Sequence, residues 1–268
     1  MPELPEVETV KRTMEMNIGS RVKQVEILRM DILRQKEFEP GELQGQTLTA
    51  IHRRGKFLVL HLAGDLFVVV HMGMSGRFYM LSEEAEVKEP HVHFILYLDS
   101  QRKLIYQDAR RFGGIWLSKD TTKLFAQMGV EPLSDDFTVE YLVRVLLNRK
   151  VAIKTLLLNQ KMICGLGNIY ADEALFEAGI KPNRPAGSLK KREITRLHRS
   201  IQVVLSQSIE RRGTTFRDYR DGFNLEGENQ HYLKVYGRHG SSCPRCGSEL
   251  ERDRIGGRSS HFCPHCQR

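Results

Sequence analysis

Long apolar runs are missing from this sequence. No stretch approaches the roughly 18 consecutive apolar residues that a membrane-spanning helix needs, and the acidic first residues lack the apolar segment of a secretion signal. Cysteine is scarce as well: the chain has five in 268 residues, and four of them fall within residues 243–268. That distribution excludes the disulfide framework of a small secreted protein. Together these absences predict a cytoplasmic protein.

Acidic residues are too few to balance the basic ones. There are 33 Asp and Glu against 41 Lys and Arg, which gives a net charge of +8. Residues 186–220 alone carry nine basic and three acidic side chains. Such a patch suits a polyanion, most simply nucleic acid. A solvated helix surface in a mildly basic protein would have the same composition, so charge alone leaves both interpretations open.

Internal repeats and low-complexity tracts are also absent, and the periodicity changes once along the chain. Residues 21–117 contain short β-type runs without helical crossovers, which predicts an antiparallel sandwich. After Thr138 the apolar spacing becomes helical, in the segments 138–147, 152–160, 168–179 and 188–211. We therefore expect a two-domain α+β protein. Its expected parts are an N-terminal helix and sandwich (1–130), a linker (131–136), a helical domain (137–232) and a terminal four-cysteine segment (233–268).

The four clustered cysteines form the strongest local motif. They occur as "CPRC" and "CPHC" with sixteen residues between the pairs, and they are Cys243, Cys246, Cys263 and Cys266. This spacing is typical of a zinc site with four thiolate ligands. A closed site leaves no coordination position for a substrate, so we expect one structural zinc ion and no catalytic metal or organic cofactor. Cys164 stands apart and is expected to be a small buried hydrophobe.

The opening "MPELPEVETV" has two interpretations. As a helix start, it combines proline near the first turn with acids at the positive end of the helix dipole. As a reactive terminus, it offers Pro2 as a secondary amine once Met1 is removed. An α-amine has a reference pKa of about 7.7–8.0, far below that of lysine, and so remains partly unprotonated at neutral pH. An activated amine of this kind is a nucleophile for aldehyde-type carbons.

Three further motifs are weak when taken singly. "CGLGNIYADE" (164–173) puts glycines ahead of a helix that Asn168 could cap, a possible phosphate site or merely a connection. "DARRFGG" (108–114) could bind phosphate and insert Phe112 into a base stack, or be a hairpin tip with Phe112 buried. "RRGKF" (53–57) places a lysine at the start of a strand, where lysine is usually solvated.

In this order along the chain, these motifs together with "HMGMSGRF" resemble the formamidopyrimidine-DNA glycosylases, bacterial enzymes that excise oxidised purines. The resemblance covers essentially the whole sequence. It implies a catalytic helix and β-sandwich, a helical domain with a helix–two-turn–helix motif, and a zinc finger. It also implies a monomeric bifunctional glycosylase and abasic-site (AP) lyase that acts on double-stranded DNA in base excision repair, cleaving by β,δ-elimination.

The resemblance assigns the catalytic roles. Pro2 would attack C1′ of the damaged nucleotide and Glu3 would shuttle a proton at the sugar. Lys56 would contact DNA and assist base release or β-elimination. Arg258 would bind the phosphates flanking the lesion and serve the second, δ-elimination. Glu6 matches an acid of the opening motif with a structural role.

The binding residues come from the resemblance as well. Those expected to contact DNA are His91, Arg110, Arg149, Lys154, Gly167 and Asn168. Those expected to fill the space left by the extruded nucleotide are Met74, Arg110 and Phe112. Residues 214–230 would close over the extruded base. Their composition departs from the family pattern, and Ser75 stands where some relatives carry glutamate, so the lesion spectrum is left open.

Two rivals are open at this point. Endonuclease VIII shares the implied fold and amine chemistry but removes oxidised pyrimidines; "LPEVET" and the Arg-Arg-Phe-Gly tip favour the purine enzyme. A zinc-ribbon DNA-binding protein without chemistry would not require proline at position 2.

Overall fold

The computed structural model describes residues 1–268, which divide into two units. The N-terminal unit comprises Met1–Ala126 and Arg211–Gln230, and the C-terminal unit comprises Gln127–Glu210 and His231–Arg268. Both units are therefore discontinuous in sequence. None of the helices is long and apolar enough to cross a membrane.

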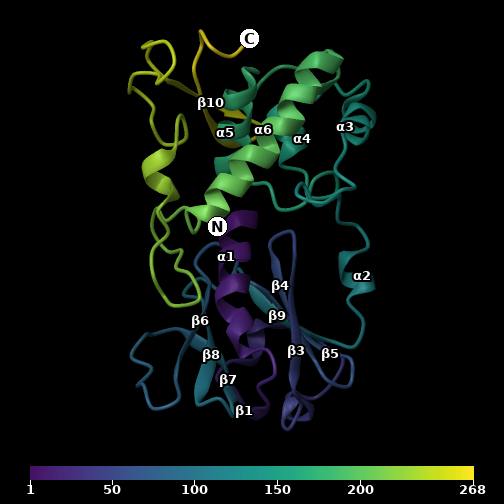
Figure 1. The fold of residues 1–268 in the computed structure, drawn as a ribbon, viewed down its shortest axis with the longest axis vertical. Helices are drawn as coiled ribbons and strands as arrows, with labels where there is room; N and C mark the ends of the chain where they lie inside the picture. The colour runs from purple at the N-terminus through teal and green to yellow at the C-terminus, as the bar shows by residue number, and fades with distance from the viewer. The chain divides into compact units, whose positions relative to one another are not determined.

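Two sheets make up most of the N-terminal unit (Figure 1). The first has the order β1 (Val22–Ile27), β7 (Val92–Leu98), β8 (Arg102–Gln107) and β6 (Arg77–Ser82). The second has the order β2 (Leu33–Lys36), β9 (Gly114–Ser118), β5 (Leu66–His71), β4 (Phe57–Leu62) and β3 (Leu48–Arg54). Every pair of neighbouring strands is antiparallel except β2 and β9. The expected antiparallel sandwich is thus confirmed.

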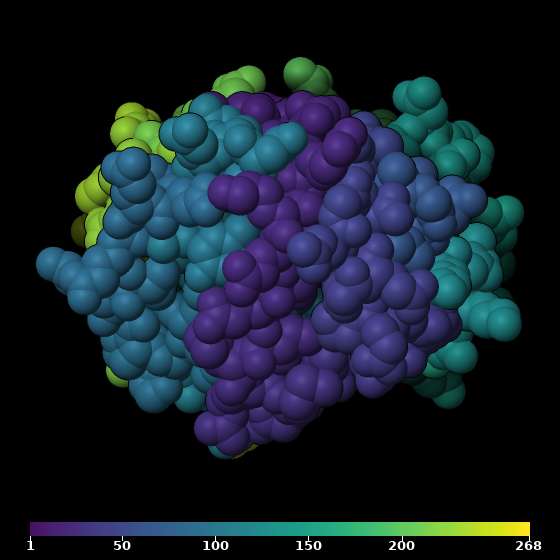
Figure 2. All heavy atoms as spheres, turned by 90° about the horizontal axis from the view of Figure 1, so that it is seen from below, coloured from purple at the N-terminus to yellow at the C-terminus, as the bar shows by residue number.

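Helix α1 (Leu4–Met14) contributes to the core of this sandwich. Val7, Val10 and Met14 recur on one face at helical spacing, are fully buried, and join the cluster of apolar side chains from both sheets. The helix contacts β3 and β6, which are edge strands of the two different sheets. The first residues of the chain are therefore fixed by the same packing that closes the sandwich. In Figure 2 the purple N-terminal residues lie between darker blue and steel-blue segments of the unit.

Residues 211–230 belong to the N-terminal unit, although they were expected in the helical domain. The physical reason is their packing. Tyr219 is 6% exposed and joins the sandwich core. The Gly222 carbonyl accepts a hydrogen bond from the Met80 amide of β6 at 2.9 Å, and a Cβ at Gly222 would come within 2.1 Å of the Thr13 hydroxyl of α1. Composition gave no sign of this because few of these residues are apolar.

The C-terminal unit is built on four helices. They are α3 (Val139–Leu146), α4 (Ile153–Leu157), α5 (Asn168–Ala178) and α6 (Lys191–Glu210). Helix α5 is buried on almost every side, and it packs against both α6 and the terminal hairpin of β10 (Glu251–Ile255) and β11 (Arg258–Phe262). The helical spacing after Thr138 is confirmed. The four-cysteine segment packs into this unit instead of standing apart.

Candidate active site and nucleic-acid interface

Pro2 lies buried just ahead of α1, while Met1 is 53% exposed. The proline in the first turn of the helix is Pro5, so Pro2 is not needed as a helix-starting residue. Glu3 is the N-cap and is 3% exposed; its carboxylate accepts a hydrogen bond from the backbone of Glu6. Residue 2 therefore sits at the positive end of the helix dipole, directly beside a carboxylate.

Glu6 ties this terminus to residues 211–230. One of its carboxylate oxygens accepts the Glu3 amide at 2.8 Å and the other accepts the Thr214 amide at 2.7 Å. Gly213 approaches so closely that a Cβ there would lie 2.9 Å from the Glu6 carboxylate, and its φ is +77°. Tyr219 adds hydroxyl contacts to the carbonyls of Glu6 and Arg212. The Glu6 carboxylate therefore bonds backbone amides, which fits the structural role expected for it.

Lys56 lies in the two-residue turn between β3 and β4, not in a strand, and is only 6% exposed. Gly55 supplies the left-handed conformation that this tight turn requires, with φ +56°. Arg53 of β3 binds Glu8 of α1 at 2.9 Å and so holds the hairpin against the helix. Burial, and then the charge of Lys56, lower the pKa of His71 to about 4. His71 is therefore neutral at physiological pH beside a buried cation.

The loop carrying Arg110 and Phe112 is organised by Asp108, which is completely buried. Its carboxylate accepts the Ser75 hydroxyl at 2.5 Å, the Gly113 amide at 2.9 Å and the Arg110 amide at 3.3 Å. The Tyr106 hydroxyl also contacts it, and burial followed by this carboxylate raises the pKa of Tyr106, which keeps the hydroxyl protonated as a donor. This carboxylate thus joins both ends of the loop, and the Arg34 guanidinium bonds the Arg111 and Gly113 carbonyls between them.

Phe112 is 61% exposed at the tip of this loop, which overturns the interpretation of a buried hairpin residue. The Arg110 guanidinium lies 5.7 Å from its ring centroid and is itself exposed. His91 is exposed too, and its carbonyl accepts the Asp108 amide at 3.1 Å. Met74 is in the adjoining loop, where a Cβ at Gly73 would lie 2.4 Å from the Gly113 nitrogen. The expected DNA-contacting and void-filling side chains of the N-terminal unit are therefore brought together.

In the C-terminal unit, α5 begins differently from the expectation. Gly167 is its N-cap, whereas Asn168 is the first helical residue. The Asn168 side-chain amide donates instead to the Ser259 carbonyl of β11 at 3.0 Å. Sequence alone could not reveal this, because the partner lies on a distant strand. The amide groups of the first helical turn keep the anion-binding potential expected for Gly167 and Asn168.

The position of Lys154 differs from the expected one. It was taken as a DNA contact, but its side chain is 0% exposed, and its ammonium group lies 2.7 Å from both the Asp172 carboxylate and the Ser259 carbonyl. A DNA phosphate does not reach an ammonium group placed in this way. Arg149 is exposed in the turn that follows α3, as a phosphate contact requires. Arg258 is exposed as the first residue of β11, after the Gly256-Gly257 turn.

The four cysteines fit a zinc ion. Their sulfur atoms all lie within 4.8 Å of one another. Tetrahedral Zn–S bonds of about 2.3 Å imply S···S separations of about 3.8 Å, and Cys243–Cys266 and Cys246–Cys263 are separated by 3.9 and 3.5 Å. Backbone amides donate to the sulfurs of Cys243 and Cys263 at 3.4 Å, as in folded zinc knuckles. Bound zinc would hold both knuckles and leave no open coordination position.

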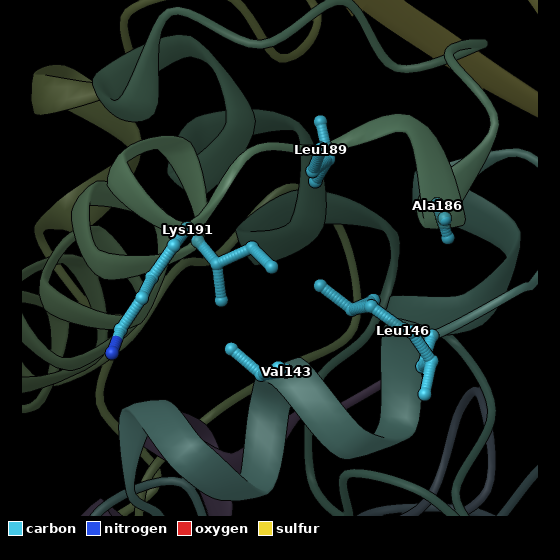
Figure 3. A pocket seen from close by; sticks show the side chains of 8 residues that line it. Val143, Leu146, Ala186, Leu189 and Lys191 are labelled. Carbon is cyan, nitrogen blue, oxygen red and sulfur yellow. The ribbon is translucent and has the colours of Figure 1, made fainter.

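A separate pocket in the C-terminal unit has the wrong chemistry for catalysis (Figure 3). It lies between α3, α6 and the short turn before α6. Its lining is mainly aliphatic, including Val143, Leu146 and Leu189, and the ammonium group of Lys191 points away from them. It offers no titratable pair, so catalysis is assigned to the polar features above.

Comparison with known proteins identifies the chain. Residues 1–115 match the model of the formamidopyrimidine-DNA glycosylase N-terminal domain and residues 128–220 match that of its H2TH domain. Residues 240–268 match the zinc finger found in FPG and IleRS. The chain belongs to the formamidopyrimidine-DNA glycosylase family. It is therefore an enzyme of DNA repair, in a family of glycosylases that also have abasic-site lyase activity.

Relatives of known sequence and structure agree over the full length. The formamidopyrimidine-DNA glycosylase of Syntrophomonas wolfei is 57% identical over 267 residues, with complete coverage of both chains. The MutM (Fpg) protein of Thermus thermophilus is 39% identical with a TM-score of 0.88, covering 99% of this chain and 98% of that one. Lactococcus lactis Fpg in complex with abasic-site DNA is 35% identical with a TM-score of 0.91, covering 99% of both chains. The expected family and fold are confirmed.

Several organising residues were missed by the sequence reasoning. They are Asp108, Asp172, Glu173 and Tyr219. Burial raises the pKa of Glu173, whose carboxylate accepts three successive backbone amides between Lys234 and Tyr236. Asp108 lies inside a strongly polar motif, where a buried carboxylate looks the same as a solvated one, whereas Asp172 and Glu173 lie in the largely apolar α5. A charged residue in an otherwise buried helix such as α5 was the one available signal.

Proposed function

We propose that this glycosylase removes oxidised purines, 8-oxoguanine and formamidopyrimidines, from double-stranded DNA and then cleaves the strand by β,δ-elimination. The observation that carries the proposal is the placement of residue 2. It is a buried proline with no helix-starting role, located at the positive end of α1 and adjacent to the buried carboxylate of Glu3. Met1 is exposed, so an aminopeptidase can remove it and release a secondary amine.

The reaction follows from that amine. The Pro2 nitrogen attacks C1′ while the bond to the damaged base breaks and its electron pair leaves with the base. Opening of the sugar gives an iminium ion, which is cationic without protonation and accepts electrons. Loss of a C2′ proton then expels the 3′ phosphate, and a second elimination expels the 5′ phosphate. Glu3 moves the proton at the sugar; its buried position favours transfer without competition from water.

Two cations complete the proposed chemistry. Lys56 is buried in a rigid turn beside neutral His71, a location where a cation interacts strongly with a phosphate or a developing negative charge. Arg258 is exposed at a tight glycine turn of the finger, ready to bind phosphate and to serve the δ-elimination. Zinc supplies folding energy to that finger and takes no part in bond breaking.

The proposed DNA interface uses exposed side chains on rigid loops. His91, Arg110 and Arg149 bind phosphates, as do the amides at Gly167 and Asn168. Phe112 enters the base stack when the nucleotide is extruded, with Met74 and Arg110 filling the remaining space. Phe112 is held at 61% exposure by a loop that Asp108 makes rigid, which is the arrangement an inserting side chain needs.

Borohydride trapping tests the proposal. Reduction of the mature protein with an 8-oxoguanine duplex should give a covalent complex, and peptide mass spectrometry should place the link on a peptide that begins at Pro2. A protein with a tag fused directly ahead of Pro2 is the matched control and should give no complex. A cross-link on Lys56 or on another lysine would refute the assignment.

The preference for purines needs its own measurement. One solved Lactococcus lactis Fpg complex contains DNA with an oxidised pyrimidine, so the substrate class is not fixed by the fold. Excision should be compared on duplexes that differ only in carrying 8-oxoguanine or an oxidised pyrimidine. Faster release of the purine is expected, and the opposite order would favour the endonuclease VIII type of specificity.

A further inference from the structure

A buried ion pair lies inside the C-terminal unit, below the finger hairpin. Lys154 of α4 and Asp172 of α5 are each fully excluded from solvent, and their charged atoms are 2.7 Å apart. Placing two charges in the interior costs several kcal/mol per ion unless every remaining donor and acceptor is satisfied. The additional partners of this pair therefore show what the pair is holding.

Those partners lie on β11. The Lys154 ammonium donates to the Ser259 carbonyl at 2.7 Å. Asp172 accepts the Ser260 hydroxyl and the His261 amide, both at 2.9 Å. Three consecutive residues of the strand are thus bonded to one ion pair. The residue immediately before them is Arg258.

The hairpin tip is fixed on the other side of Arg258 as well. A Cβ at Gly256 would lie 2.6 Å from the Thr155 hydroxyl of α4, so the turn sits close against that helix. Asn168 donates to the same Ser259 carbonyl as Lys154 does. The backbone before Arg258 therefore lies close against α4, and the backbone after it is bonded to α4 and to the N-terminal turn of α5.

We propose that Lys154, together with Asp172, is a positioning residue for Arg258 and not a DNA-binding residue. The pair holds the start of β11 against α4 and α5. Arg258 then meets the phosphate in the orientation that the δ-elimination requires. The inference rests on the proposed role of Arg258. Two hydrophobic residues of similar volume could fill this space, but they could not fix the strand by directional bonds.

The test uses zinc-loaded, full-length protein and an abasic-site duplex. Lys154→Met keeps most of the side-chain volume and removes the donor to Ser259. The ratio of β- to δ-elimination products should rise by roughly tenfold to a hundredfold, the loss expected when a reacting group moves by about 1 Å. Zinc content should stay at the parent value. Lys161→Met, at an exposed lysine in the same unit, is the matched control and should change none of these.

A second variant guards against a failure to fold. Lys154→Met combined with Asp172→Asn removes both charges and keeps an acceptor for β11, and it should show the same shift in products. If both variants bind zinc but keep the parental product ratio, the positioning role is refuted. It is also refuted if both lose zinc or unfold, because the pair then serves folding alone. A salt dependence of binding shallower than that of Arg258→Ala would refute it too and would return Lys154 to the DNA contacts.

Arg258→Ala separates this inference from the proposed function. If that variant retains δ-elimination, the role of Arg258 itself is wrong. If Arg258→Ala loses δ-elimination and Lys154→Met does not, only the positioning role fails.

Discussion

At the scale of single residues, the site is organised by carboxylates that never meet solvent. Asp108 shapes the loop of Arg110 and Phe112, Glu6 joins two backbone amides from distant segments, and Asp172 holds three residues of β11 through its own bonds and those of Lys154. Each of these acids binds backbone or hydroxyl donors instead of substrate. The groups proposed to react or to contact DNA are thus left free of this structural task.

Phe112 gives a prediction at this scale. Phe112→Ala should change the free energy of unfolding by less than about 0.5 kcal/mol, because the ring is 61% exposed. Excision of 8-oxoguanine should fall by roughly tenfold to a hundredfold, since a stacked aromatic contributes about 1–3 kcal/mol per base. Cleavage at an abasic site, which is already unstacked, should fall less. Thermal melting and single-turnover excision are the measurements.

Met30→Ala is the control, at an apolar side chain of similar exposure (59%) in the same unit. Met30→Ala should leave both the free energy of unfolding and the rate of 8-oxoguanine excision unchanged. A Phe112→Ala protein that excises 8-oxoguanine at the parental rate would remove Phe112 from the wedge role.

At the scale of elements, α1 and residues 211–230 act together through Glu6. Glu6→Gln keeps the shape of the side chain but turns one acceptor into a donor that faces a backbone amide. A buried donor left without an acceptor costs about 1–3 kcal/mol. The variant should therefore melt earlier, and the amides of Glu3 and Thr214 should lose protection in hydrogen exchange. Excision and abasic-site cleavage should both decrease, because the nucleophile and the loop are displaced together.

Glu15→Gln, at a half-exposed acid just after the same helix, is the matched variant; it should change neither the hydrogen-exchange protection at Glu3 and Thr214 nor the activity. Unchanged protection at Thr214 in Glu6→Gln would show that residues 211–230 are held by their other contacts, such as Tyr219 and the Gly222 carbonyl, and not by Glu6.

The elements were largely predictable and their partners were not. The spacing of Val7, Val10 and Met14 predicts α1, and alternation predicts the sandwich, because both depend on near neighbours in the chain. The four-cysteine cluster is predictable for the same reason. Local pattern placed Asn168 as an N-cap and the family resemblance placed Lys154 as a DNA contact, and neither could reveal their common partner, the Ser259 carbonyl. Polar contacts between residues far apart in the sequence could not be predicted from it.

At the scale of the whole molecule, zinc gives the clearest prediction. Cys246→Ser should remove the metal and unfold the finger, because zinc binding supplies about 10–16 kcal/mol of folding free energy to such segments. DNA binding should be lost with it, since Arg258 is carried by the finger. Metal analysis should give one zinc per chain in the parent. The finger also shares a small core with Phe176 and Val235, so its loss should lower the melting temperature of the C-terminal unit.

Cys164→Ser is the control for sulfur chemistry. Cys164 is buried outside the cluster and donates to the Val130 carbonyl, which serine can also do. It should retain zinc and activity. Full activity of metal-free Cys246→Ser would overturn the structural role of the ion.

The return of residues 211–230 to the N-terminal unit has a consequence for biosynthesis. When Ala126 leaves the ribosome, every strand of the sandwich exists, yet Tyr219 is missing from its core, and Glu6 and Met80 lack the partners that Thr214 and Gly222 provide. At about 5–20 residues per second, the missing segment arrives roughly 5–20 s later, after all of α6 has been made. Translation of the first half of the gene therefore cannot complete the N-terminal unit. Part of the apolar interior of the nascent sandwich stays uncovered until residues 211–230 are translated.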